Sequence, residues 1–157
     1  MSNNFFDNWI RWEFERVDTQ RKLPYFYYDN TSLVAIFLAS RSKIKQLLPH
    51  PKMKPVEIVP GRCIVAFAAF EYRKTDFEPY NEVSISFLIT LGKRSIPGIS
   101  AAKMMLSRAT SSYVWQLPVT TEHARAGGAD LFGYPKFLAN IEFNKQNDWI
   151  ACSLAEG

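Results

Sequence analysis

Large apolar residues alternate with small or polar ones along much of the chain, and this period of two predicts β-strands. The alternation is clearest in CIVAFAAFEYR, which begins at Cys63, and in VSISFLITL, which begins at Val83. Residues 32–39, SLVAIFLA, are apolar almost throughout, so we expect a buried strand there. Three more strands are predicted at residues 113–119, 136–143 and 149–155.

Three segments have the apolar spacing or the capping residues of helices. The first 18 residues place apolar side chains at intervals typical of an amphipathic helix. A short helix is expected from Ser40 or Ser42 up to Pro49, and another is expected to be capped by Ser100. These helices are expected to flank the strands.

A fourth helix is predicted in TTEHARAGGADLF, which begins at Thr120, although Gly127 and Gly128 lie in its middle. Each glycine costs a helix interior about 1 kcal/mol relative to alanine. Either the helix ends at these glycines, or close packing requires small residues there. Gly133 then supplies a break before the strand that begins at Lys136.

These elements indicate a mainly β (α+β) fold with a barrel-like antiparallel sheet and flanking helices. Small residues alternate with large ones in the strand from Cys63, which suits the tapering interior of a small barrel, although a sandwich would tolerate the same pattern. The chain has 157 residues, 47% of them hydrophobic, which is enough for one core and too few to require two. We therefore expect a single domain over residues 1–157.

The charge pattern gives little support for a nucleic-acid partner. There are 19 Lys and Arg against 15 Asp and Glu, and the basic residues are scattered. The longest basic cluster, SRSKIKQLLPHPKMK, also has helical apolar spacing, which favours a solvated helix face. No apolar run reaches the roughly 18 residues of a membrane helix, and no signal peptide is recognised. We expect neither nucleic acid nor membrane as a partner, and a cytoplasmic location.

The markers of several common chemistries are missing from the sequence. It has no Walker loop, no GxGxxG, no GxSxG and no HExxH motif. Cys63 and Cys152 lie in strand-like runs without a CxxC spacing, so neither a disulfide framework nor a zinc site is expected. His123 lies between Glu122 and Arg125, which resembles a helix surface more than a catalytic triad. We expect no metal and no organic cofactor.

Lys136 is the most informative polar residue, because it interrupts the otherwise strand-like segment LFGYPKFLANIEF. A lysine at the head of a strand is usually a solvated edge residue. Alternatively, an apolar pocket penalises the ammonium form and favours the neutral amine, which is the nucleophile in lysine chemistry. The residue pattern alone leaves both interpretations open.

The run LPVTTEHARAGGADLFGYPKFLANIEF resembles the acetoacetate decarboxylase family around its Schiff-base lysine, where a Tyr-Pro-Lys segment follows a helix and opens a strand. A thinner likeness extends through SLVAIFLASRSKIKQLLP and FEPYNEVSISF. The resemblance implies that Lys136 is the catalytic amine and that Glu78 places substrate or moves a proton. It also implies that Glu122 and Tyr134 contact the substrate or support the residues that do.

The implied reaction is a lyase reaction through a lysine iminium, in which a small β-keto acid such as acetoacetate loses carbon dioxide. The resemblance also implies a homo-oligomer. Similar proteins use the same lysine for aldol condensation and dehydration or for cyclisation of a keto acid, and these reactions stay open as alternatives. A non-catalytic barrel that binds a small molecule is a further alternative.

Three departures from the family pattern affect these expectations. Phe137 stands where the decarboxylase has a second lysine, so any activation of Lys136 is expected to come from burial. Asn30 stands where the decarboxylase has an arginine near the entrance, which leaves Arg125 as our candidate for binding a substrate carboxylate. The family continues well beyond the position of Gly157, so we expect part of the barrel to be absent or to come from another chain.

Overall fold

The computed structural model describes residues 12–16, 19–93 and 95–156, and these residues contain ten β-strands and three α-helices. The strands are β1 (Trp12–Arg16), β2 (Thr19–Leu23), β3 (Tyr27–Ser40), β4 (Met53–Pro55), β5 (Glu57–Val59), β6 (Arg62–Thr75), β7 (Tyr80–Leu91), β8 (Ser112–Val119), β9 (Lys136–Gln146) and β10 (Trp149–Glu156). The helices are α1 (Arg41–Leu47), α2 (Ile99–Ser107) and α3 (Glu122–Phe132).

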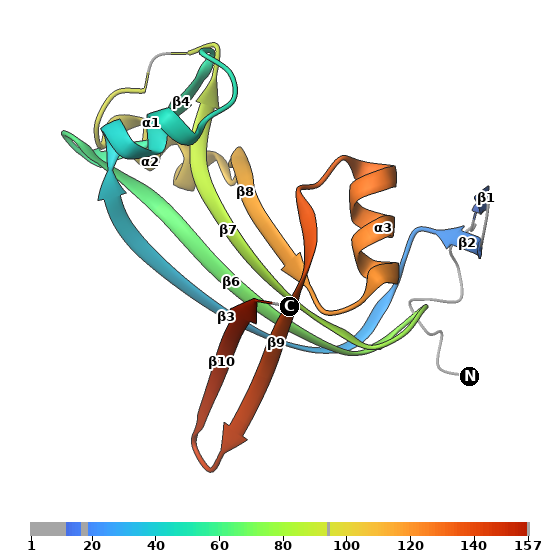
Figure 1. Cartoon of the computed structure of the whole chain (residues 1–157). Helices are drawn as coiled ribbons and strands as arrows, with labels where there is room; N and C mark the ends of the chain where they lie inside the picture. The colour runs from blue at the N-terminus through green and yellow to red at the C-terminus, as the bar shows by residue number, and fades with distance from the viewer. Residues whose placement is uncertain (1–11, 17–18, 94, 157) are drawn as a thin grey trace, which may run out of the picture.

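One large sheet forms the body of the molecule, with strand order β10-β9-β8-β7-β6-β3, and it curls into a half-barrel (Figure 1). The short strands β4 and β5 pair with β7 and β6. Neighbouring strands are antiparallel except β8 and β9, which are parallel because α3 crosses between them. The prediction of a mainly β, barrel-like sheet with flanking helices is therefore confirmed.

The long strands agree with the sequence pattern, and the N-terminal prediction does not. Residues 12–16 form β1, which pairs with β2 in a separate two-stranded sheet, so the helix predicted over the first 18 residues is wrong there. Residues 1–11 and 17–18 lie outside the described part of the chain. The strands β4 and β5 have three residues each, which is too short for a periodic pattern to reveal.

The strand predicted over residues 32–39 forms within β3, but it is not buried. Val34 and Ile36 are 65% and 68% exposed, and Phe37 and Leu38 on successive faces are also exposed. β3 lies at the edge of the sheet, so only β6 pairs with it over its length. The apolar composition that predicted burial therefore produces an exposed apolar edge strand.

Two clusters of buried side chains stabilise the half-barrel. The larger cluster surrounds Ile44 of α1 and packs it against Val65, Phe87 and Ile89 of β6 and β7. The smaller cluster joins Tyr80 and Val119 to Ala124 of α3. The second cluster fixes α3 against the ends of β7 and β8, which is where the candidate site lies.

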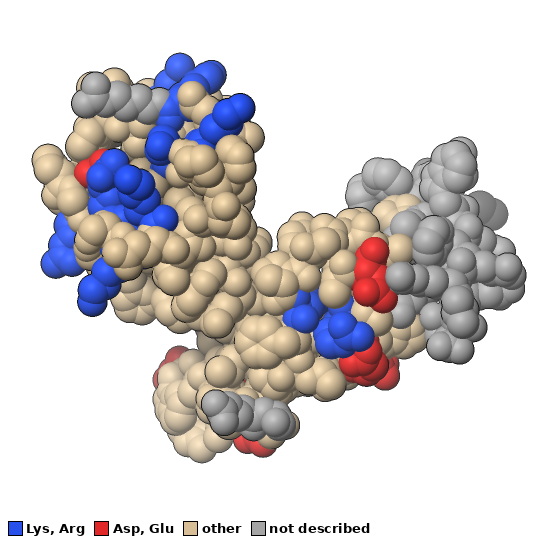
Figure 2. Space-filling model, turned by 45° about the horizontal axis from the view of Figure 1, so that its top comes forward, with Lys and Arg blue, Asp and Glu red and all other residues tan. Residues whose placement is uncertain are grey.

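The basic side chains gather more closely in space than along the sequence. Figure 2 shows a group of Lys and Arg residues over the end of the molecule that carries α1, α2 and β4, and Lys43, Lys45, Lys52 and Lys103 are exposed there.

Among the described residues, no helix is long and apolar enough to cross a membrane.

Candidate active site

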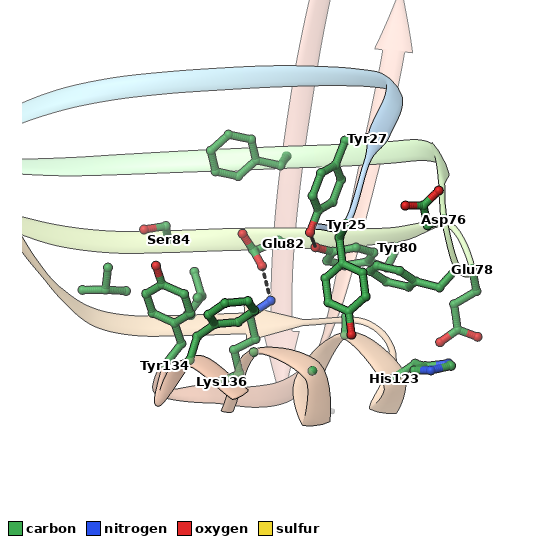
Figure 3. A pocket seen from close by; sticks show the side chains of 18 residues that line it. Tyr25, Tyr27, Asp76, Glu78, Tyr80, Glu82, Ser84, His123, Tyr134 and Lys136 are labelled. Atoms are coloured by element: carbon green, nitrogen blue, oxygen red, sulfur yellow. Dashed lines mark hydrogen bonds and ion pairs between the residues drawn. The ribbon is translucent and has the colours of Figure 1, made fainter. Parts of the chain in front are cut away.

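A cavity of about 660 Å³ opens between α3 and the strands β6, β7 and β8 (Figure 3). Most of its lining side chains are aromatic or aliphatic, and a few are ionisable. The lining includes Tyr25, Tyr27, Phe70, Asp76, Phe77, Glu78, Tyr80, Glu82, Ser84, Leu117, His123, Phe132, Tyr134 and Lys136. Its volume lies within the roughly 300–1,000 Å³ of typical small-molecule sites.

The turn between α3 and β9 aims Lys136 into this cavity. Gly133 ends α3 in the left-handed conformation (φ 68°), and its N–H donates to the carbonyl of Ala129. Lys136 then opens β9 opposite Leu117 of β8. Because successive side chains of a strand point to opposite faces, Phe137 points away from the cavity and is 43% exposed.

Lys136 is held in a buried ion pair. Its Nζ donates a hydrogen bond of 2.7 Å to Oε2 of Glu82, and the two side chains are 8% and 11% exposed. The Nζ atom also lies 5.5 Å from the centre of the Tyr80 ring, within the range of a cation–π contact. The amine is therefore enclosed between a carboxylate and an aromatic ring. Of the two interpretations that the sequence left open, the solvated edge lysine does not apply to Lys136, because its side chain is buried in the cavity.

The sequence analysis missed Glu82, because the predicted strand starts at Val83 and so leaves Glu82 in the preceding loop. In the structure β7 begins at Tyr80, so Glu82 and Ser84 share the face of the strand that lines the cavity. Val83 and Ile85 point the other way. The alternation of Ser84, Ile85 and Ser86 was a usable signal. Extended by two residues toward the N-terminus, it places Glu82 on the same face of the strand as Ser84.

Gly128 explains why α3 tolerates glycines in its middle. A Cβ added to Gly128 would overlap Cδ and Cε of Lys136 and would lie 3.0 Å from its Nζ. The helix continues through both glycines, capped by the Thr121 hydroxyl, which accepts from the N–H of Ala124. Of the two explanations that the sequence left open, close packing is therefore the correct one at Gly128.

We expect Gly128→Ala to move Lys136 without unfolding the protein. The flexible lysine side chain can yield to the new methyl group, and the helix gains about 1 kcal/mol from the better helix former. Moving Nζ out of its place in the cavity should slow its attack on a bound carbonyl by roughly 10²-fold, which borohydride trapping with a small ketone would measure. In a Lys136→Ala background the same change should only stabilise, and a loss of stability there would contradict this explanation.

Three tyrosines form a closely packed group beside the ion pair, and two of them are joined by a hydrogen bond. The hydroxyls of Tyr27 and Tyr80 lie 3.2 Å apart, and the rings of Tyr72 and Tyr80 have centres 4.8 Å apart. Burial, followed by the nearby charge of Glu82, raises the pKa of Tyr72 and Tyr80 well above the usual value. Burial also raises the pKa of Tyr27. These hydroxyls are therefore neutral hydrogen-bonding groups over the physiological pH range.

The tyrosine group predicts a loss of stability in alkali. A pKa that is higher in the folded state contributes stability that is complete below the unfolded value of about 10 and is lost as pH rises further. We expect the free energy of unfolding to fall above about pH 10, while ultraviolet absorbance shows some tyrosines still neutral. Tyr80→Phe should reduce this pH dependence, and an unchanged slope would show that other groups cause it.

The other residues predicted for the site lie in two places. Glu78 and Tyr134 line the cavity, with Glu78 exposed beside its entrance near His123 (Figure 3). Arg125 and Glu122 are not among the described lining residues. They pair with each other on α3, where the Arg125 Nε lies 2.7 Å from Glu122 and the hydrogen bond lowers the pKa of Glu122.

Arg125 does not line the cavity that contains Lys136. Its guanidinium is held by Glu122 through two hydrogen bonds, which corresponds to the helix pair expected at a spacing of three residues. Asn30, at the position of the family's entrance arginine, lies in β3 opposite Tyr72 and does not line the cavity. In this structure neither residue replaces that arginine in the cavity.

The curled sheet and its cavity place the chain among proteins that enclose a ligand-sized space within a half-barrel. The chain belongs to the acetoacetate decarboxylase family, whose model matches residues 15–157. The resemblance seen in the sequence is thereby confirmed. The comparison with curated protein sequences gives no match.

Solved structures of the family share the fold at low sequence identity. Acetoacetate decarboxylase from Legionella pneumophila is 16% identical with a TM-score of 0.64, over 85% of this chain and 45% of that chain. A second structure of acetoacetate decarboxylase is 18% identical with a TM-score of 0.65, over 85% and 47%. The enduracididine biosynthesis enzyme MppR, complexed with a condensation product of pyruvate and imidazole 4-carboxaldehyde, is 13% identical with a TM-score of 0.51, over 76% and 42%. This chain spans less than half of their lengths.

Proposed function

We propose that the chain carries the reactive amine of a Schiff-base lyase that acts on a small carbonyl compound, with Lys136 as nucleophile. The observation that supports this most directly is the buried pair of Lys136 and Glu82, 2.7 Å apart in a cavity of ligand size. A surface lysine would not need such a partner, and burying a charged pair is seldom a gain for stability. The family membership supports the same function.

The proposed reaction begins with transfer of a proton from the Lys136 ammonium to Glu82. The neutral amine then attacks the substrate carbonyl, and loss of water gives an iminium ion. With a β-keto acid such as acetoacetate, the electron pair of the breaking bond to carbon dioxide moves toward the iminium nitrogen and leaves an enamine. Glu82 gives the first proton to the departing water, takes up a second proton from solvent and delivers it to the enamine carbon, and hydrolysis releases the ketone and restores the amine. These steps require only the substrate, water and the protein.

Glu78 and Tyr134 are proposed to position the substrate. Both line the cavity, and the Tyr134 ring lies 6.2 Å from the ring of Phe132 on the wall formed by α3. Glu78 lies at the entrance, away from the Lys136 and Glu82 pair (Figure 3). We therefore assign proton transfer at the reacting carbon to Glu82 and leave Glu78 a role in substrate entry.

A non-catalytic binding protein is the second candidate, and the ion pair itself favours it. Glu82 stabilises the ammonium form of Lys136, which is unreactive toward carbonyls. In that case the cavity would bind a small molecule, with Lys136 and Glu82 as polar contacts. The two candidates differ in one property, which is whether the amine reacts.

Trapping with sodium borohydride distinguishes the two candidates. The protein would be incubated with acetoacetate, pyruvate or acetone, reduced, and examined by intact mass and peptide mapping. A stable adduct at Lys136 supports the proposed enzyme. Absence of any adduct at Lys136 between pH 5 and 9, with the protein folded, would contradict it and favour the binding protein.

We also propose that the chain forms a homo-oligomer in the cytoplasm, with β3 pairing to β3 of a second copy. β3 has 14 residues, lies at the sheet edge and exposes apolar side chains on both faces. An identical strand can pair antiparallel across a two-fold axis and cover the same side chains in both copies.

Ile36→Lys is expected to weaken this self-association by about tenfold or more, because it places a charge on the edge strand. Sedimentation velocity over a range of concentrations would measure the effect. Val59→Lys, which replaces an exposed apolar residue of β5, is the matched control and should not alter association. Equal effects of the two changes would contradict pairing through β3.

A further inference from the structure

Charged residues are distributed unevenly along the molecule. The end that carries α1, α2, β4 and β5 comprises residues 41–62, 89–93 and 95–112, and these ranges hold nine of the 19 Lys and Arg residues of the chain. Glu57 is the one Asp or Glu within them, and it is buried and paired with Arg41. Figure 2 shows the basic side chains gathered over this end. The α2 end therefore presents a basic surface that attracts anions.

The outward face of α2 adds large apolar side chains to this basic surface. Ala101 is the buried residue of the helix, whereas Met105 and Leu106 are 78% and 86% exposed and Ile99 is 63% exposed. Lys103 lies between Ile99 and Leu106 at the i, i+4 and i+7 spacing of a single helix face, and all three line a shallow groove. An apolar face of this kind gains stability where its side chains leave water.

The segments joined to α2 also expose apolar side chains. Ile96 precedes the helix and is exposed, and Val59 of β5 is exposed as well. The N–H of Gly98 donates to the carbonyl of Glu57, which ties the start of α2 to β5. Apolar and basic side chains are therefore interspersed over a few neighbouring elements, and contiguous exposed apolar surface typically marks an interaction site.

The combination of charge and apolar exposure distinguishes between anionic partners. Nucleic acids are bound mainly through phosphate contacts from basic and polar side chains, which give exposed aliphatic residues such as Met105 and Leu106 no role. An anionic membrane uses both kinds of side chain, because basic residues are attracted to lipid head groups and aliphatic residues enter the boundary with the acyl chains. Lys103 suits this boundary, since a long Lys side chain can extend from an apolar face to the level of the head groups.

From these observations we infer that the α2 end is a docking surface for the face of a membrane that contains anionic phospholipids. The helix lies along the bilayer surface, with Ile99, Met105 and Leu106 in the interfacial region. Lys103 and the surrounding basic residues contact the head groups. Our expectation of no membrane partner considered spanning segments and signal peptides, and surface binding requires neither. The inference does not depend on the proposed function, because it does not require Lys136 to react.

Flotation of the protein with lipid vesicles tests the inference. One set of vesicles contains equal parts of phosphatidylcholine and phosphatidylserine, and the other contains phosphatidylcholine alone. We expect the protein to float with the first set and not with the second, and added salt to weaken binding by screening the charges. Leu106→Gln and Lys103→Glu should each weaken binding to the phosphatidylserine vesicles by about tenfold or more.

Two exposed residues of the hairpin formed by β9 and β10 provide matched controls. Leu154→Gln and Lys145→Glu repeat the same two substitutions on a part of the chain that projects away from the sheet (Figure 1). They should leave vesicle binding unchanged. All four side chains are exposed, so the variants are expected to fold, and their melting temperatures would verify this.

Several outcomes would overturn the inference. The first is failure of the folded protein to bind phosphatidylserine vesicles, and the second is equal binding to both sets of vesicles. Equal effects of the α2 variants and the hairpin controls would place the contact elsewhere. Binding of single-stranded poly(U) that needs Lys103 but not Leu106, without vesicle binding, would identify a nucleic-acid surface. Loss of self-association in Leu106→Gln, without vesicle binding, would show that a second copy covers α2.

Discussion

Lys136→Arg is expected to abolish adduct formation and turnover while leaving the protein folded. The guanidinium can keep an ion pair with Glu82, but it stays protonated and cannot attack a carbonyl. We expect turnover to fall by at least about 10³-fold, as for the loss of other covalent nucleophiles. Intact mass after borohydride reduction and a continuous assay with the trapped substrate would measure the two effects.

Lys136→Ala provides the comparison for stability. It leaves the Glu82 carboxylate, whose side chain is 11% exposed, without its partner. Breaking a buried pair from one side typically destabilises by about 3–5 kcal/mol. We therefore expect a large loss of stability for Lys136→Ala and a much smaller one for Lys136→Arg. An adduct that persists in either variant would show that another lysine is the reactive amine.

Glu82→Gln is expected to separate formation of the Schiff base from the later proton transfer. Without the carboxylate, the amine of Lys136 loses its ion-pair partner but stays in the cavity, so trapping at neutral pH should continue. The amide cannot exchange a proton with the enamine carbon, and turnover should fall by about 10²–10⁴-fold. Burst-phase measurement of the adduct, together with steady-state turnover, would measure the two effects separately.

Glu57→Gln is the matched control for Glu82→Gln. Glu57 is also a buried carboxylate in an ion pair, 2.9 Å from Nε of Arg41, but it lies at the end of the molecule near α1. It should lower stability without altering trapping or the pH profile of turnover. Parallel losses of trapping and turnover in Glu82→Gln would mean that Glu82 only positions the lysine.

Much of this site could be predicted from sequence where the signals are local. The break at Gly133 and the Tyr-Pro-Lys segment located the start of β9, and hence Lys136, within a few residues. The partner of that lysine could not be found in the same way, because Glu82 lies 54 positions earlier and pairs with Lys136 only through the order of the strands. The family resemblance pointed to Glu78, which is close to Glu82 in sequence but is exposed and lies away from Lys136 (Figure 3).

Local patterns in the sequence also predicted the long strands of the fold, but they did not predict which strand lies at the edge of the sheet. Period-two alternation identified β6 and β7, since each strand has a face that must be buried. Apolar composition could not show that β3 is an edge strand, because exposure depends on which strand, if any, pairs with its outer side. The segment of β1 was also mistaken for part of a helix, since short segments with mixed aromatic and charged residues satisfy both periods.

The short parallel contact between β8 and β9 has a consequence for motion. Three residue pairs join these strands, beginning with Leu117 and Lys136, and the amide of Asn81 adds one hydrogen bond to the carbonyl of Ile141. The hairpin of β9 and β10 otherwise projects away from the body of the sheet (Figure 1). Together with the Lys136–Glu82 ion pair, these contacts hold the hairpin near one end, and a segment held in this way opens locally at a lower free energy than global unfolding. Lys136 belongs to the first of these pairs, so detachment of the hairpin would withdraw the amine and widen the cavity at the same time. The exchange of ligand and the availability of the nucleophile would then depend on the same opening equilibrium.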